Sequence, residues 1–300
     1  MTAAAAGIGA ARALPGWVES TVDFLRLLSR RPVGLLGLAG IVFFILFALV
    51  VPVFVPVLDA TDVTAVYQGP SAAHPLGTDY AGRDVLNQLV HGGREILVTA
   101  ALTGFLSTLT AVALGAIAAT VGGKVDAVIV AVNDVVLTIP HFPVLVVAAA
   151  LLRPDGVVVL ALLLAALTWS ALLRQIRAQV LSLRERDYIE AARALDLGLP
   201  HIVFREILPN MRSYIVIHFI LGVTAAIYLI VGLVVLGLVP LSGKNWAITI
   251  YFAVNQGALY FRDSFLSIAS PIAMIVLFQL SLVFFVSALE DIFDPRLRRS

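Results

Sequence analysis

Apolar residues gather along the chain in six long stretches that are separated by more polar segments. A helix needs about 20 mostly apolar residues to cross the hydrocarbon core of a bilayer, and each stretch is close to that length or longer. The stretches cover residues 33–58, 96–121, 125–152, 157–173, 214–239 and 265–289. The pattern predicts an all-α integral membrane protein with six transmembrane helices.

The composition supports lipid as the solvent of this chain. Of its 300 residues, 60% are hydrophobic and 13% are charged, whereas a soluble domain is about half apolar and a quarter charged. The net charge of +1 gives no reason to expect nucleic acid as a partner. The chain has no cysteine, which excludes disulfides, thiolate metal sites and a cysteine nucleophile.

The basic residues orient the predicted spans. With the N-terminus in the cytoplasm, about three quarters of the 20 Lys and Arg residues fall on the cytoplasmic side, as the positive-inside rule requires. We therefore expect both termini to be cytoplasmic. The predicted regions are a tail (1–32), a first transmembrane helix (33–58), an extracytoplasmic loop (59–95), a five-helix core (96–289) and a second tail (290–300).

The longest predicted cytoplasmic segment is residues 174–212, which carry seven Arg. Residues 183–195 are rich in Ala, Leu, Glu and Arg, which predicts a helix. A second short helix is predicted over residues 200–207, ended by Pro209 because proline has no N–H to donate. Its apolar positions are expected to dock in a groove on a partner protein; these are Ile202, Val203 and Ile207. The alternative is an amphipathic helix that lies on anionic lipid headgroups.

Within this segment, Glu190-Ala191-Ala192 is followed at a fixed spacing by Leu208-Pro209. The arrangement resembles the EAA loop of binding-protein-dependent ABC importers. Asp196 stands where that family has Gly, and Glu206 stands where it has Ile, so we expect Gly198 to make the turn instead. The resemblance implies an ATPase-coupling loop that contains Glu190, Ala191, Ala192, Asp196, Gly198, Pro200, Ile202, Leu208 and Pro209.

Further segments resemble one branch of that family, the second (C-type) permease of dipeptide, oligopeptide and nickel importers. They are His74–Asp79, Ala81–Leu86, Gly122–Asp126 with Asp134 and Pro140, and Asp294–Arg298. Apolar residues at helical spacing after Arg83 predict an interfacial helix before the second span. The segment Leu236–Trp246 is only loosely similar to the branch, which bears on the identity of the substrate or the binding protein.

The resemblance implies a type I importer permease in a bacterial inner membrane. It further implies a homologous second permease, two ATP-binding subunits and an extracytoplasmic substrate-binding protein as partners, besides membrane lipid. The sequence has no Gly-x-x-x-x-Gly-Lys-Ser/Thr phosphate loop and no catalytic constellation. We therefore expect no enzyme activity, no metal and no bound cofactor in this chain, with ATP and Mg on the partner subunits.

Three polar residues fall within the third predicted span: Asn133, Asp134 and His141. Charged groups inside a membrane are costly and often functional, so all three are candidates to line a translocation path. The alternative for Asn133 and Asp134 is a structural ion pair, with an Arg near the cytoplasmic face, or a hydrogen bond between helices. The alternative for His141 is a neutral hydrogen-bonding residue at a kink between Pro140 and Pro143.

Rival functions follow from the same features. The same machine carrying nickel or an oligosaccharide is the nearest alternative to one that carries peptides. A secondary transporter driven by an ion gradient would show inverted repeats and paired midplane acids, whereas Asp134 is the one plausible intramembrane acid. A membrane enzyme is disfavoured because catalytic residues are lacking.

Overall fold

The structure is a computed structural model that describes residues 27–239 and 244–293, and helices dominate this part of the chain. The helices are α2 (Pro32–Leu49), α3 (Val51–Phe54), α4 (Val85–Val121), α5 (Gly123–Thr138), α6 (His141–Leu152), α7 (Gly156–Arg184), α8 (Asp187–Ala194), α9 (Leu199–His201), η1 (Ile202–Ile207), α10 (Leu208–Asn210), α11 (Arg212–Val235), α12 (Trp246–Asn255), η2 (Ala258–Tyr260), η3 (Arg262–Ser264) and α13 (Phe265–Phe293). No β-strand occurs in the described ranges. The all-α prediction is confirmed.

Five helical segments are long and apolar enough to cross a membrane, and a sixth span exists if the bent pair α5–α6 is counted as one. The kink expected between Pro140 and Pro143 is present, and it divides the predicted span 125–152 into two helices. The axes of α5 and α6 meet at 81°, where Ile139 and Pro140 adopt extended backbone. Pro140 offers no N–H to the preceding turn and disfavours helical backbone at Ile139, which accounts for the break.

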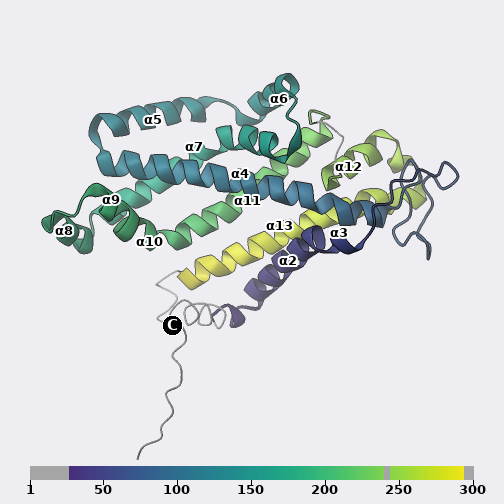
Figure 1. Cartoon of the computed structure of the whole chain (residues 1–300), viewed down its shortest axis with the longest axis horizontal. Helices are drawn as coiled ribbons and strands as arrows, with labels where there is room; N and C mark the ends of the chain where they lie inside the picture. Colours follow the sequence, from purple (N-terminus) through teal and green to yellow (C-terminus); the bar gives the residue numbers. More distant parts are fainter. Residues whose placement is uncertain (1–26, 240–243, 294–300) are drawn as a thin grey trace, which may run out of the picture.

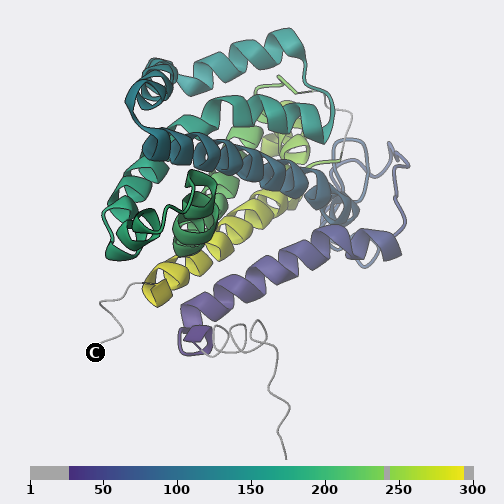
Figure 2. The same cartoon turned by 60° about the vertical axis from the view of Figure 1, so that its left-hand side comes forward.

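Helix α4 lies at the centre of the bundle and packs against α2, α5, α7, α11 and α12 (Figures 1 and 2). Glycines allow its closest contacts. A Cβ on Gly115 would lie 2.9 Å from Cγ2 of Ile176 in α7, and a Cβ on Gly104 would lie 2.9 Å from the backbone nitrogen of Val223 in α11. Small residues at helix interfaces permit this approach between membrane helices.

The start of α4 differs from the prediction. Residues 85–95 form the first part of this 37-residue helix and are not a separate interfacial helix. No proline interrupts the segment, and Gly92 and Gly93 pack under Trp246, so the helix continues into the bundle. Its N-terminus is capped by Asp84, whose side chain accepts a 2.7 Å hydrogen bond from the Asn87 backbone N–H.

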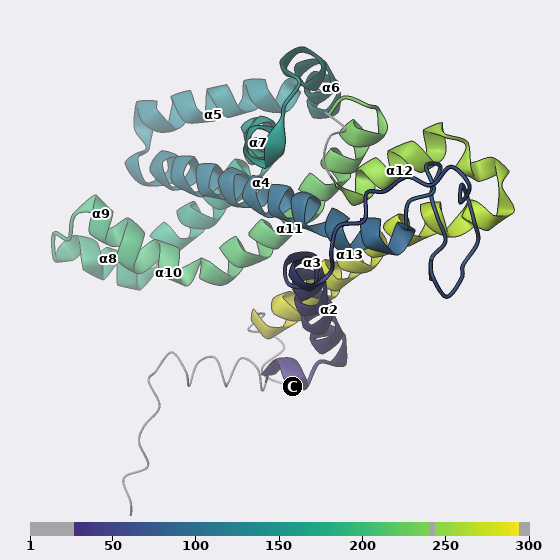
Figure 3. The ribbon, with the colours of Figure 1, turned by 45° about the vertical axis from the view of Figure 1, so that its right-hand side comes forward.

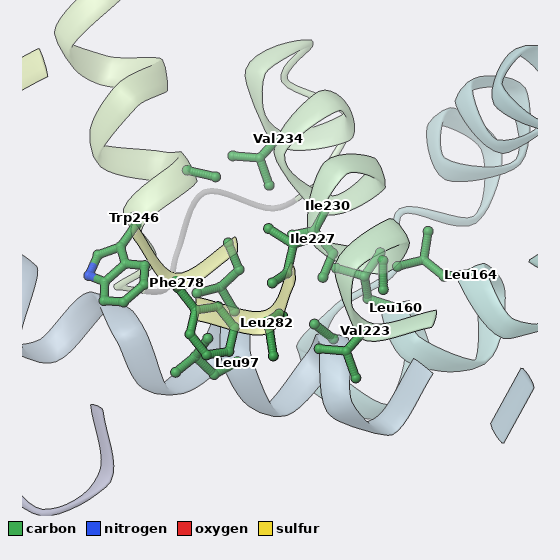
Figure 4. Packing of buried hydrophobic residues seen from close by; sticks show 14 of the residues in the cluster. Leu97, Leu160, Leu164, Val223, Ile227, Ile230, Val234, Trp246, Phe278 and Leu282 are labelled. Atoms are coloured by element: carbon green, nitrogen blue, oxygen red, sulfur yellow. The ribbon is translucent and has the colours of Figure 1, made fainter. Parts of the chain in front are cut away.

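Side chains from seven helices, α2, α4, α6, α7, α11, α12 and α13, form the main apolar core, and Figure 4 shows part of it. The figure labels Leu97 of α4, Leu160 and Leu164 of α7, Val223, Ile227, Ile230 and Val234 of α11, Trp246 of α12, and Phe278 and Leu282 of α13. Trp246 is 1% exposed, and its indole Nε1 donates to the Leu89 carbonyl at 2.7 Å. Helix α12 was not predicted, because its ten residues are too few for a span.

The connection before α4 is ordered by buried polar contacts rather than by helices. Asp79 is 5% exposed and accepts from the backbone N–H groups of Ala81 and Arg83 at 2.8 and 2.9 Å. Burial lowers the pKa of Arg83, but the hydrogen bond to Asp79, the charge of Asp79 and the contact with Tyr80 together leave the pKa above its usual value. Tyr67 donates to the Gln256 carbonyl at 2.9 Å, which joins this connection to the end of α12.

Residues near the chain ends are only partly within the described ranges. The predicted tails 1–32 and 290–300, and the motif Asp294–Arg298, fall wholly or largely outside them, as does part of Leu236–Trp246. Where α2 begins, Arg31 Nη1 lies 3.0 Å from Asp291 Oδ2 near the end of α13. Figure 2 shows these two helices side by side.

Glycine in α2 makes this pairing with α13 possible, which gives a testable consequence. A Cβ on Gly37 would lie 2.5 Å from the Phe285 nitrogen and 2.8 Å from the Ser281 carbonyl oxygen. Gly37→Leu should therefore destabilise the protein by about 1–3 kcal/mol, the usual cost of overpacking. The measurement is thermal unfolding of the purified protein in detergent. Leu36→Ala is the control, because Leu36 is 65% exposed and should change the midpoint little.

Candidate functional site

Residues 185–211 form a compact loop structure at one end of the bundle, between α7 and α11 (Figure 3). An apolar cluster seats this structure on the adjoining ends of α4 and α7. The cluster, which we call the loop seat, contains Ala116 and Ala119 of α4, Ile176 and Val180 of α7, and Ile189, Ala192, Ile202, Ile207 and Met211 of the loop. Burial of these side chains fixes the loop on the bundle.

The loop seat overturns one prediction. Ile202 and Ile207 are 3% and 0% exposed, so they pack within this chain and are not available to a groove on a partner; Val203 is half-buried beside them. The exposed apolar residues of the loop are different ones. Leu195 is 73% exposed, Leu199 51% and Phe204 69%. The sequence did not reveal these exposed residues, because an apolar residue in a loop helix can face either the bundle or the outside. Phe204 is exposed although it lies in sequence between the buried residues Ile202 and Ile207.

The Glu190-Ala191-Ala192 tripeptide lies on α8. Ala192 is buried in the loop seat, while Glu190 and Ala191 face outward. Glu190 is in the first turn of α8 together with Asp187, where negative charge interacts favourably with the helix dipole. The predicted continuous helix over residues 183–195 is wrong, because α7 ends at Arg184 and Arg186 adopts extended backbone before α8 begins.

The turn after α8 is made by Asp196, with φ +54°. The Asp196 N–H donates to the Arg193 carbonyl at 2.9 Å, and the Leu197 N–H donates to the Ala192 carbonyl at 3.1 Å. These two bonds define a Schellman motif, whose left-handed position is usually glycine. Gly198 has φ −59°, so the expectation that Gly198 makes this turn is wrong. Asp196 takes the backbone conformation that glycine would adopt.

The second helix of the loop also differs from the expected one. Residues Leu199–His201 are α-helical, but Ile202–Ile207 form a π-helix, and helix resumes over Leu208–Asn210. Pro209 therefore does not end the helix. A π-helical turn before Pro209 accommodates the missing N–H, and such turns are frequent at functional sites. Glu206 is the second position at which the loop differs from the EAA pattern, and its Oε1 lies 3.8 Å from His201 Nε2.

The polar residues of the third span lie on α5 and α6, apart from the loop (Figure 1). Asp134 Oδ1 lies 2.7 Å from Arg174 Nη2 of α7, which confirms the ion-pair alternative. His141 Nε2 is 3.3 Å from the Val136 carbonyl across the bend, as expected of a residue at a kink. Asn133 is fully buried, and neither of its amide atoms has a hydrogen-bond partner. A role in lining a path stays a prediction for all three.

Metal-binding residues do not cluster in the described ranges: they contain no group of three or more His, Asp or Glu that could hold an ion. An open cleft of about 570 Å³ lies where α7 meets α8, lined by Leu183, Glu185, Arg186, Asp187, Tyr188 and Asn210. The outward side of the loop thus offers polar and apolar surface together, which suits contact with another protein.

A bundle of five or six candidate spans with a compact loop structure anchored at one end is the fold of a multi-pass membrane protein. The family described as binding-protein-dependent transport system inner membrane component matches residues 111–299, and the chain belongs to this family. Residues 21–70 match the N-terminal TM domain of oligopeptide transport permease C. The chain is therefore a multi-pass inner-membrane permease, and the predicted family is confirmed.

Curated relatives cover most of the chain. It is similar to a putative peptide permease protein of Brucella abortus, with 36% identity over 237 residues, which are 78% of this chain and 77% of the relative. It is also similar to the oligopeptide transport system permease protein OppC of Mycobacterium tuberculosis, at 31% identity over 210 residues, 69% of this chain and 72% of the relative. The dipeptide transport system permease protein DppC of Lactococcus lactis is 28% identical over 239 residues, 79% of this chain and 68% of the relative.

The left-handed backbone at Asp196 predicts the effect of substitution there. Asp196→Gly should raise the stability of the loop by a few tenths to about 1 kcal/mol, and Asp196→Val should lower it by about 1–2 kcal/mol, because β-branched side chains clash in this conformation. Hydrogen exchange at the amides of Asp196 and Leu197 measures the change.

Gly198→Ala is the matched control for Asp196. Gly198 has negative φ, and the nearest atom to an added Cβ is Pro200 Cδ at 3.8 Å. The alanine variant should exchange at the wild-type rate. Protection that is lost in Gly198→Ala but kept in Asp196→Val would contradict the assignment of the turn.

Proposed function

We propose that this chain is the C-type permease subunit of an ATP-driven importer and forms half of a translocation path for di- or oligopeptides. The relatives named as peptide, oligopeptide and dipeptide permeases support a peptide cargo. They favour peptides over the nickel and oligosaccharide alternatives. Membership of a binding-protein-dependent family argues against an ion-gradient-driven secondary transporter.

The proposal assigns residues 185–211 to docking of an ATP-binding subunit. The observation that supports this assignment most directly is that the loop has a buried side and an exposed side. Ile189, Ile202 and Ile207 are buried in the loop seat. Leu195 and Phe204 are exposed. Exposed aromatic and aliphatic side chains on a rigid support are typical anchors of a protein interface. Glu190 of the same loop is exposed too and carries a charge.

The proposal assigns the remaining partners to the two ends of the bundle. With the loop in the cytoplasm, residues 55–84 and the segment from α12 to α13 lie on the extracytoplasmic side (Figure 3). This side would receive the substrate-binding protein, and a homologous second permease would complete the path. ATP and Mg would be bound by the two ATP-binding subunits, so the residues of this chain act mechanically and bind no cofactor.

Because the loop is seated on α4 and α7, force on the loop reaches the spans directly. Closure of the ATP-binding subunits would displace α8 and η1, and the loop seat would carry the displacement to Ile176 and Val180 of α7. The spans would then alternate between inward-open and outward-open arrangements, as a two-state mechanism requires.

Docking through Phe204 is tested by affinity purification of the tagged chain from its native membrane. Phe204→Ser should reduce the recovery of ATP-binding subunits by about tenfold, because it removes an exposed anchor, without lowering the thermal stability of the permease. Ile207→Ser should lower that stability, because Ile207 is 0% exposed. Wild-type protein that is recovered without any ATPase would contradict the proposed function.

Glu190→Lys tests coupling itself. The exposed position predicts normal insertion and stability, while the reversed charge should uncouple ATP hydrolysis from peptide uptake. Uptake and hydrolysis are measured together on the complex in proteoliposomes. Arg193→Gln, another exposed position on α8, is the control. Wild-type uptake by Glu190→Lys would count against a coupling role for this residue.

A further inference from the structure

Helix α5 is held to the bundle in an unusual way. Of its residues Gly123–Thr138, only Asn133 is buried, and Asn133 is polar and unpaired. Most of the apolar surface of α5 is exposed or half-exposed, including Val128 at 62% and Val135 at 63%. Apolar packing within this chain therefore contributes little to its position, and the position must depend on other contacts.

Two ion pairs supply those contacts, and both run from α5 to α7. Arg177 donates from Nε and Nη2 to the two carboxylate oxygens of Asp126, at 2.6 Å each. Arg174 donates from Nη2 to Asp134 at 2.7 Å. The first pair is bidentate, the geometry that gives the strongest and most directional ion pairs. It is also less exposed to solvent. The Arg177 and Asp126 side chains are 30% and 22% exposed, whereas those of Arg174 and Asp134 are 59% and 50% exposed.

The arginines lie on the part of α7 that carries the coupling loop. Arg177 directly follows Ile176 and precedes Val180, and both apolar residues belong to the loop seat. Helix α7 is unbroken from Gly156 to Arg184, so this segment moves as one body with the loop. A bidentate ion pair transmits displacement in the plane of the two groups, whereas a smooth apolar contact would allow α5 to slide.

The other end of α5 leads directly to the bend at Pro140 and to α6. Helix α6 is anchored separately, because its Leu145 and Ala149 are 0% exposed within the main apolar core. The bend therefore separates a core-anchored α6 from α5, whose first turns are tied to α7 by the Asp126–Arg177 pair.

We propose that the Asp126–Arg177 ion pair is a positioning contact that makes α5, the first part of the broken span, follow the coupling loop. This inference rests on the proposed function. The pair stays closed through the transport cycle and carries loop displacement from α7 into α5. Without it, the loop still binds the ATP-binding subunit and hydrolysis continues, but α5 no longer follows and peptide is not released across the membrane.

The test uses the complete complex in proteoliposomes, with peptide uptake and ATP hydrolysis measured in the same sample. Asp126→Asn and Arg177→Gln should each keep hydrolysis within about twofold of wild type and lower the ratio of uptake to hydrolysis by about tenfold, a typical size for coupling between sites. The charge exchange Asp126→Arg with Arg177→Asp should recover at least half of the ratio. Lys124→Gln is the control, because Lys124 is exposed on the same helix.

The ratio distinguishes this contact from a merely structural one, which would lower uptake and hydrolysis together. An unchanged ratio in both single variants, or a charge exchange that folds but recovers nothing, would overturn the inference while leaving the proposed function intact. Purification without ATP-binding subunits would instead overturn the proposed function.

A second measurement applies if the charge exchange fails to fold. The chain has no cysteine, so Asp126→Cys with Arg177→Cys can be joined selectively by a short bifunctional maleimide. Cross-linked complex should transport at a higher ratio than the same variant without cross-linker, because the link restores the tie. Loss of uptake on cross-linking would show that the contact must open, which overturns the inference.

Discussion

The close approach of α7 and α11 to α4 is the constraint on which the other features depend. Membrane helices gain little from moving apolar surface out of lipid, so they associate through fit and through polar contacts. Gly104 and Gly115 allow this fit, because atoms of α11 and α7 occupy the space that a side chain at either position would need. Gly115 lies under Ile176, which belongs to the loop seat. The loop seat therefore depends on a glycine near the end of α4.

The spans were predictable because length and apolar content decide whether a helix crosses a bilayer. A kink beside Pro140 was expected as well, but its 81° angle was not, since a hydropathy pattern is equally satisfied by a straight or a broken helix. Helix α12 was missed for a related reason. Six of its ten residues are buried, Trp246 among them, and composition alone does not reveal such packing in a helix too short for a span.

The sequence predicted two short helices between the fourth and fifth spans, and the structure has them, but the buried and exposed sides of this loop were predicted wrongly. Ile202, Ile207 and Phe204 are all apolar, and only the packing on α4 and α7 shows which of them are buried. The π-helical turn likewise follows from accommodating Pro209 within a continuous helical path, a choice that depends on where the next span begins. Asp134 was correctly weighed as an ion-pair residue because a lone charge in a span needs a partner.

Asp196 shows what kind of information a sequence motif records. The position is defined by a backbone dihedral of φ +54° and two hydrogen bonds, and glycine is the commonest residue that meets this requirement rather than the only one. A pattern search that demands glycine would reject this chain although its turn has the same shape. Substitution tables that score Asp against Gly by side-chain chemistry would misjudge it too, so divergent members are better sought by allowing Asn and Asp wherever a helix ends in left-handed backbone.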